Sequence, residues 1–144
     1  MKKALFCVLS ALITTSLIYG QKINEKEVPN VVKAEISKKY PNIPKVTWEK
    51  EKGNFEANWG GKSGEDHSIV YSPEGKLLET SEAIPVSALP VNITSYVREH
   101  YKSEKIKDAD KVTNAKGKIT YEVEVNKKDL IFDEKGNFLK TEEE

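Results

Sequence analysis

The sequence predicts an α+β fold in which a helix packed on a four-stranded antiparallel meander occurs twice. Three observations lead to this prediction. Two proline-flanked stretches carry an apolar residue at every fourth position, the second stretch begins 61 residues after the first, and turn sequences that contain Gly75 and Gly136 keep the same offset. Because helical stripes and turns recur together, we interpret the two halves as a tandem repeat of one helix-plus-sheet unit.

The two predicted helices follow Val28-Pro29 and Leu89-Pro90. Proline is tolerated in the first turn of a helix, where its missing N–H removes no hydrogen bond. The first helix is expected to end at Tyr40, because Pro41 disfavours helical geometry in the residue before it. Each helix has one apolar stripe, formed by Val28, Val32, Ile36 and Tyr40 in the first and by Leu89, Ile93, Val97 and Tyr101 in the second.

Alternating apolar and polar residues after each helix predict antiparallel strands. Gly53-Asn54 and Lys116-Gly117 supply hairpin turns, and the stretch from Thr80 to Ala88 is expected to connect the two units. The apolar residues that should face the helices are Phe55, Ala57 and Trp59 in the first unit and Tyr121, Val123 and Val125 in the second.

The first residues have the character of a secretory signal peptide. Lys2 and Lys3 precede an uncharged run that ends at Tyr19, and the small residue Gly20 follows. The run is too short and too rich in Ser and Thr for a membrane-spanning helix. We therefore predict a signal peptide over 1–20 that is cleaved near Gly20, a periplasmic or secreted mature protein with no stable membrane anchor, and repeat units over 21–84 and 85–144 that together form one domain.

Several kinds of chemistry find no support in the residues. The chain has 23 basic and 23 acidic side chains, so no positive excess favours nucleic-acid binding. Cys7 is the only cysteine and lies in the predicted signal peptide. His67 and His100 lack the spacing of zinc ligands, and Asp108 and Asp110 are expected to be solvated strand edges. Since no catalytic motif occurs either, we predict a protein that is not an enzyme and uses no cofactor.

The residue pattern resembles the secreted PepSY-like family, also described as beta-lactamase-inhibitor-like. The segments that carry the resemblance are Val28-Pro29, Tyr40-Pro41, Val46-Thr47-Trp48-Glu49, Phe55-Glu56-Ala57, the stretch from Ser72 to Thr80, Leu89-Pro90, Tyr101, and the stretch from Tyr121 to Val125. The resemblance implies a tandem helix-plus-four-strand fold, no known catalysis, and a bacterial envelope or extracellular location. Beta-lactamase-inhibitor proteins grip their target with a concave sheet face, and PepSY domains are associated with restraining peptidases.

The polar members of the strand alternation define a candidate binding surface. If the apolar members face the helices, the other members lie on the open face of the sheet and make it acidic. They are Glu56, Asn58, Glu122 and Glu124. The leading hypothesis is a non-catalytic binding module that docks an envelope or extracellular protein on this face, including a peptidase or other hydrolase. The alternative is a small-molecule or metal-ion binding envelope protein, and an open sheet face is also commonly wet without any ligand.

Overall fold

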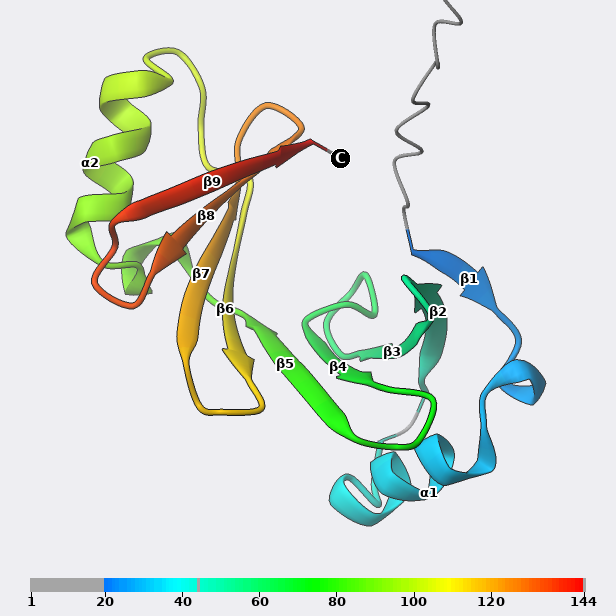
Figure 1. Cartoon of the computed structure of the whole chain (residues 1–144). Coiled ribbons are helices and arrows are strands. Elements are labelled where there is room, and N and C mark those ends of the chain that lie inside the picture. The colour runs from blue at the N-terminus through cyan, green and yellow to red at the C-terminus, as the bar shows by residue number, and fades with distance from the viewer. Residues whose placement is uncertain (1–19, 44, 144) are drawn as a thin grey trace, which may run out of the picture.

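The computed structural model describes residues 20–43 and 45–143, so the predicted signal peptide over 1–20 lies outside the described residues except for Gly20. Nine antiparallel strands follow one another in chain order across one sheet (Figure 1). They are β1 (Gln21–Ile23), β2 (Thr47–Glu51), β3 (Asn54–Trp59), β4 (His67–Tyr71), β5 (Leu77–Ala83), β6 (Asp108–Asn114), β7 (Ile119–Glu124), β8 (Lys128–Asp133) and β9 (Phe138–Glu143). The helices are α1 (Asn30–Lys39) and α2 (Val91–His100), each preceded by a single 3-10 turn, Glu25–Glu27 and Val86–Ala88.

Both α-helices form where the apolar spacing predicts them. Each begins directly after a proline, Pro29 or Pro90, and each is followed by a tyrosine at its carboxyl end. The backbone N–H of Tyr40 donates to the Ile36 oxygen, and that of Tyr101 donates to the Val97 oxygen, both at 2.8 Å. These bonds close the last turn before the chain leaves the helix. The predicted end of the first helix at Tyr40 is therefore confirmed.

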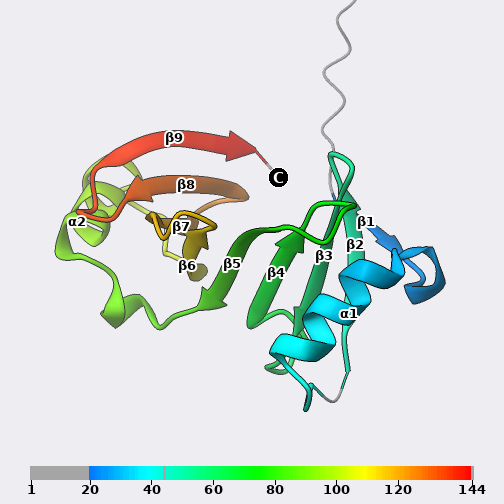
Figure 2. The same ribbon diagram turned by 60° about the horizontal axis from the view of Figure 1, so that its bottom comes forward.

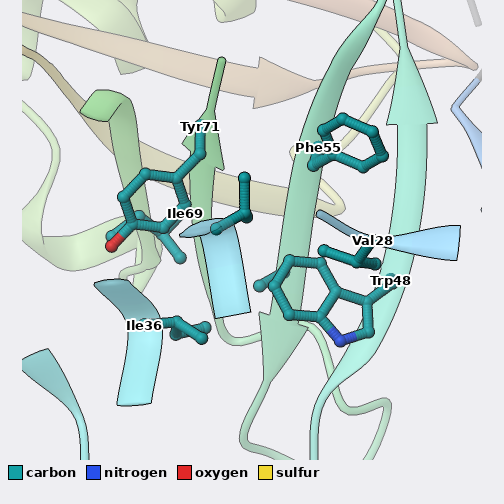
Figure 3. Close-up of a cluster of buried hydrophobic side chains, with 8 residues drawn as sticks. Val28, Ile36, Trp48, Phe55, Ile69 and Tyr71 are labelled. Atoms are coloured by element: carbon teal, nitrogen blue, oxygen red, sulfur yellow. The ribbon is translucent and has the colours of Figure 1, made fainter. Parts of the chain in front are cut away.

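The helices cover two separate parts of one sheet face. In Figure 2, α1 lies against β2, β3 and β4, whereas α2 lies behind β8 and β9 in the other half of the molecule. Figure 3 shows apolar side chains filling the space between α1 and these strands. The buried cluster under α1 consists of Val28, Val32, Ile36, Trp48, Phe55, Ala57, Ile69 and Tyr71, and the cluster under α2 of Leu89, Ile93, Val97, Ala109, Val123, Val125, Leu130 and Phe132. The predicted contacts between helix stripes and strands are confirmed.

The turns before β5 and β9 are built alike and let a helix come close. The N–H of Gly75 donates to the Ser72 oxygen and that of Gly136 to the Asp133 oxygen, both at 2.9 Å. Both glycines have φ near +80°, a conformation that other residues rarely adopt. A Cβ on Gly75 would lie 2.8 Å from Cγ2 of Val31 in α1. Glycine is thus required by the backbone conformation and, at Gly75, by the helix packing.

The sheet differs from the prediction in two respects. The four-stranded units are not separate, because β5 pairs with β6 through contacts such as Thr80 with Thr113, and β1 adds a strand beside β2. The expected connector from Thr80 to Ala88 is wrong, since β5 runs to Ala83. The sequence does not indicate a strand in this segment, because polar residues lie on both faces of β5 and no apolar alternation marks it. The tandem repeat of four-stranded units remains a prediction.

Candidate functional site

The sheet face opposite the helices is hollowed into a groove of about 770 Å³. Residues from β2 near one end of the sheet and from β9 at the other end line this same hollow. The sheet must therefore curl around it, and Figure 2 shows β9 arching over towards the half that contains β2 and β3. On β3, β4, β7 and β8 the lining residues alternate with the buried core residues, as expected for opposite faces of a sheet.

Acidic side chains dominate the groove. Two lysines line it, and each already has a carboxylate partner: Lys52 Nζ lies 3.1 Å from Oε1 of Glu51, and Lys140 pairs with Glu142. Within the part of the chain that the structure describes, no lysine, arginine or histidine forms an ion pair with the four carboxylates further along the groove. These four are Glu56, Glu79, Asp110 and Glu122.

Burial disfavours the ionised form of these carboxylates and so raises their pKa values. Burial, with a smaller contribution from the neighbouring charges of Asp129 and Asp110, raises the pKa of Glu122 to about 7. Burial also raises the pKa of Glu56, although a hydrogen bond with Ser68 lowers it. Partial desolvation also raises the pKa values of Asp110 and Glu79, although the Glu79 residue remains exposed to solvent. Water therefore stabilises the ionised forms of these carboxylates poorly, and a cation in the groove would favour them.

The structure brings together only part of the predicted site. Glu56 and Glu122 both line the groove and are half-buried rather than freely exposed. Asn58 shares their face but is only 7% exposed, which corrects the expectation of a solvent-facing amide. Glu124 does not line the groove: it borders a neighbouring hollow, and Lys107 Nζ lies 2.7 Å from its Oε2.

Two of these four groove carboxylates, Glu79 and Asp110, were not among the predicted site residues. Glu79 lies on β5, whose second half resembled a connector, so its strand face could not be assigned. Asp110 was expected to be a solvated strand edge, but β6 lies inside the sheet between β5 and β7. The buried residues of β6 are Ala109 and Val112, which lie three positions apart, so no regular alternation of apolar residues predicts which side chains share a face. Strand pairing, which is non-local, places both residues.

The histidines have structural contacts. His67 stacks on Trp59 with ring centroids 5.6 Å apart, and His100 stacks on Tyr96 at 4.0 Å. Among the residues that the structure describes, no group of three His, Cys, Asp or Glu side chains is arranged to hold a metal ion. Within the same residues, no helix combines the length and apolar character needed to cross a membrane.

The antiparallel sheet with two helices is shared with the beta-lactamase-inhibitor-like (BLIP-like) proteins. The chain belongs to the family described as "Putative beta-lactamase-inhibitor-like, PepSY-like", whose model matches residues 18–79 and again 64–140. The predicted family resemblance is thereby confirmed. No curated protein matches the sequence.

Solved structures from Bacteroides share the fold. A "BLIP-like protein" from Bacteroides fragilis has a TM-score of 0.56 at 21% identity, covering 79% of this chain and 85% of the other. A DUF2874 family protein from Bacteroides ovatus has a TM-score of 0.65 at 19% identity, covering 79% and 86%. A structure from Bacteroides eggerthii, described as one of "putative periplasmic proteins", has a TM-score of 0.69 at 15% identity, covering 80% and 88%.

Proposed function

We propose that this protein is a non-catalytic periplasmic binding module that holds a lysine- or arginine-bearing segment of another envelope protein in its acidic groove. The observation that carries the proposal is the set of four groove carboxylates without an ion pair to any described residue. Desolvated carboxylates are costly unless a cation or several hydrogen-bond donors approach them. A cationic side chain in the groove supplies both.

The dimensions of the groove favour a polypeptide over a small ion. A hollow of about 770 Å³ that runs across most strands of the sheet accommodates several consecutive side chains. The apolar lining residues Val70, Val112 and Ile131 lie among the carboxylates and offer contacts to the aliphatic stems of lysine or arginine. A mixed surface of this kind suits a basic segment with both charged and apolar parts.

The family description suggests what the partner is. Beta-lactamase-inhibitor-like proteins are named for binding a hydrolase, and one solved neighbour is itself described as BLIP-like. By extension, we propose that the present chain binds and restrains a peptidase or other hydrolase that carries a basic loop. The neighbour described as periplasmic supports the same compartment.

Neutralising the groove should abolish partner binding. The triple variant Glu56→Gln, Glu79→Gln and Glu122→Gln keeps side-chain shape while removing three charges, so it should retain the fold. Binding of a lysine-rich peptide of about ten residues should weaken at least tenfold, because the variant can no longer form charge pairs with the peptide at these three positions. Isothermal titration at low and physiological salt measures this, and the wild-type affinity should also fall as salt rises.

A matched control separates the groove from general charge effects. The variant Glu25→Gln, Glu99→Gln and Glu134→Gln removes three exposed carboxylates outside the groove. It should bind the lysine-rich peptide almost as well as the wild type does, and both proteins should leave a glutamate-rich peptide unbound. Equal weakening by the two triple variants would show that net charge rather than the groove attracts the peptide, and would overturn the proposal.

Export should remove the amino-terminal segment. Because Lys2 and Lys3, the uncharged run and Gly20 form a signal-peptide pattern, we propose cleavage near Gly20 and a mature chain that begins at or near Gln21. Intact-mass spectrometry of protein recovered from the periplasm of the native host measures the mature terminus. A species that retains Met1 and fractionates with membranes would contradict this prediction.

A further inference from the structure

A second hollow lies mainly on the helix-bearing face of the sheet, in the strip that neither helix cluster fills, although Ser68 and Ser81 line both this hollow and the groove. It has a volume of about 360 Å³. Four side chains from adjacent strands form a cross-strand row along it: Trp59 on β3 pairs with His67 on β4, His67 with Glu82 on β5, and Glu82 with Lys111 on β6. None of these residues belongs to the two buried clusters, although Trp59 packs at the edge of the first.

One wall of this hollow is aromatic. The rings of Tyr40 and Trp59 lie 5.0 Å apart at 52°, and those of Trp59 and His67 lie 5.6 Å apart at 26°. Tyr40 and Trp59 remain partly exposed. An aromatic face carries negative charge from its quadrupole, so it attracts groups whose hydrogens are slightly positive. The aromatic wall thus suits a ligand with an apolar, C–H-rich side.

The opposite wall is polar and close to neutral. Lys111 Nζ lies 3.8 Å from Oε1 of Glu82, so the two charges largely compensate each other. Both side chains are partly exposed and keep hydrogen-bonding capacity, since a carboxylate accepts several bonds and an ammonium donates three. Thr113, which carries a hydroxyl group, lines the same hollow. This wall offers donors and acceptors without a net charge that would select an ion.

We propose that this hollow binds one pyranose ring of a neutral carbohydrate. The C–H face of the sugar packs against Trp59 and Tyr40, while its hydroxyl groups bond to Glu82, Lys111 and Thr113. A charged ligand is disfavoured because it would compete with the Glu82–Lys111 pair, and a purely apolar ligand would leave that pair without hydrogen bonds. The volume is near the small end of ligand pockets and fits a single ring with its substituents.

Nuclear magnetic resonance of the full mature protein tests the site. The probes are the methyl β-pyranosides of glucose, galactose and N-acetylglucosamine, each titrated to about 50 mM, a range in which weak single-ring binding is measurable. At least one should shift the indole N–H signal of Trp59. The indole of Trp48, which is 5% exposed in the first buried cluster, serves as an internal control and should not move. Glycerol, at equal hydroxyl concentration, should shift neither signal.

Two variants assign the effect to the hollow. Glu82→Gln should weaken binding of the responding sugar by about threefold to tenfold, because it removes a charged acceptor. Thr113→Val should weaken it by a smaller factor, whereas Glu99→Gln on the exposed side of α2 should leave it unchanged. Absence of any Trp59 shift with all three sugars overturns the proposal. So does a shift that survives in both Glu82→Gln and Thr113→Val with unchanged affinity. Neither result bears on the acidic groove, because neither Glu82 nor Thr113 lines it.

Discussion

Replacing Phe132 with alanine should lower the free energy of unfolding by about 3 to 5 kcal/mol, the usual cost of emptying a large buried aromatic site. Phe132 is fully buried under α2, and its ring meets those of Tyr96 and Phe138 edge-on, with centroids 5.4 and 5.8 Å away. The loss is a large share of the stability of a typical domain. Urea unfolding followed by circular dichroism measures it.

The tryptophans make this variant a test of how the two halves are coupled. Trp48 and Trp59, the only tryptophans in the sequence, lie in the half of the sheet under α1, whereas Phe132 lies under α2. Because β5 and β6 pair through five residue pairs, we expect one cooperative transition. Tryptophan fluorescence should therefore shift to lower urea together with the circular dichroism signal.

Two further variants provide a scale for the stability loss in Phe132→Ala. Val97→Ala, which removes two methyl groups from the same cluster, should cost about 1 to 3 kcal/mol. Val91→Ala, at a position that is 74% exposed, should change stability by less than about 0.5 kcal/mol. If the fluorescence transition stays at its wild-type midpoint in Phe132→Ala while circular dichroism becomes biphasic, the halves unfold separately and the expectation of one cooperative sheet is wrong.

Local patterns explain why the helices, turns and cores could be predicted from the sequence. A stripe such as Val32 and Ile36, flanked by prolines, specifies a helix and its buried face without knowledge of the rest of the chain. The turn from Ser72 to Gly75 is likewise specified by its own four residues. Tyr71 and Phe132, 61 residues apart, are both buried in corresponding turn-proximal strands, as the repeated pattern indicates. In these parts of the chain, short-range sequence alone sets the structure.

The groove depends on pairing and curvature, which short-range patterns do not encode. Alternation places Glu56 and Glu122 on the open face, but only the curled sheet brings them into one hollow with Glu79 on β5. Alternation also places Asn58 and Glu124 on this face. Neighbouring residues bury Asn58, however, and Glu124 forms an ion pair with Lys107. The sequence therefore predicts the face of the candidate site, whereas long-range packing decides which side chains a partner can reach.

Glu122 should make the protein more stable in mild acid than in mild alkali. Burial raises its pKa from the ordinary value of 4.5 to about 7 in the folded state. Between these values the folded protein holds a proton that the unfolded chain has released, so its contribution to stability falls as pH rises through this window. Above pH 7 the carboxylate is charged in both states, and the folded state carries the full cost of a poorly solvated charge.

Glu122→Gln isolates this contribution from those of other groups. The glutamine is neutral at every pH, so the variant should match wild type near pH 4, below the ordinary pKa of 4.5, and exceed it at pH 8 by up to about 3 kcal/mol, the upper bound set by the size of the pKa shift. Urea unfolding of both proteins at several pH values measures the difference between them. Glu99→Gln, which is exposed, should parallel wild type throughout. A Glu122→Gln advantage that is the same at pH 4 and pH 8 would mean that Glu122 titrates normally, and the groove would then hold no destabilised charge for a cationic partner to relieve.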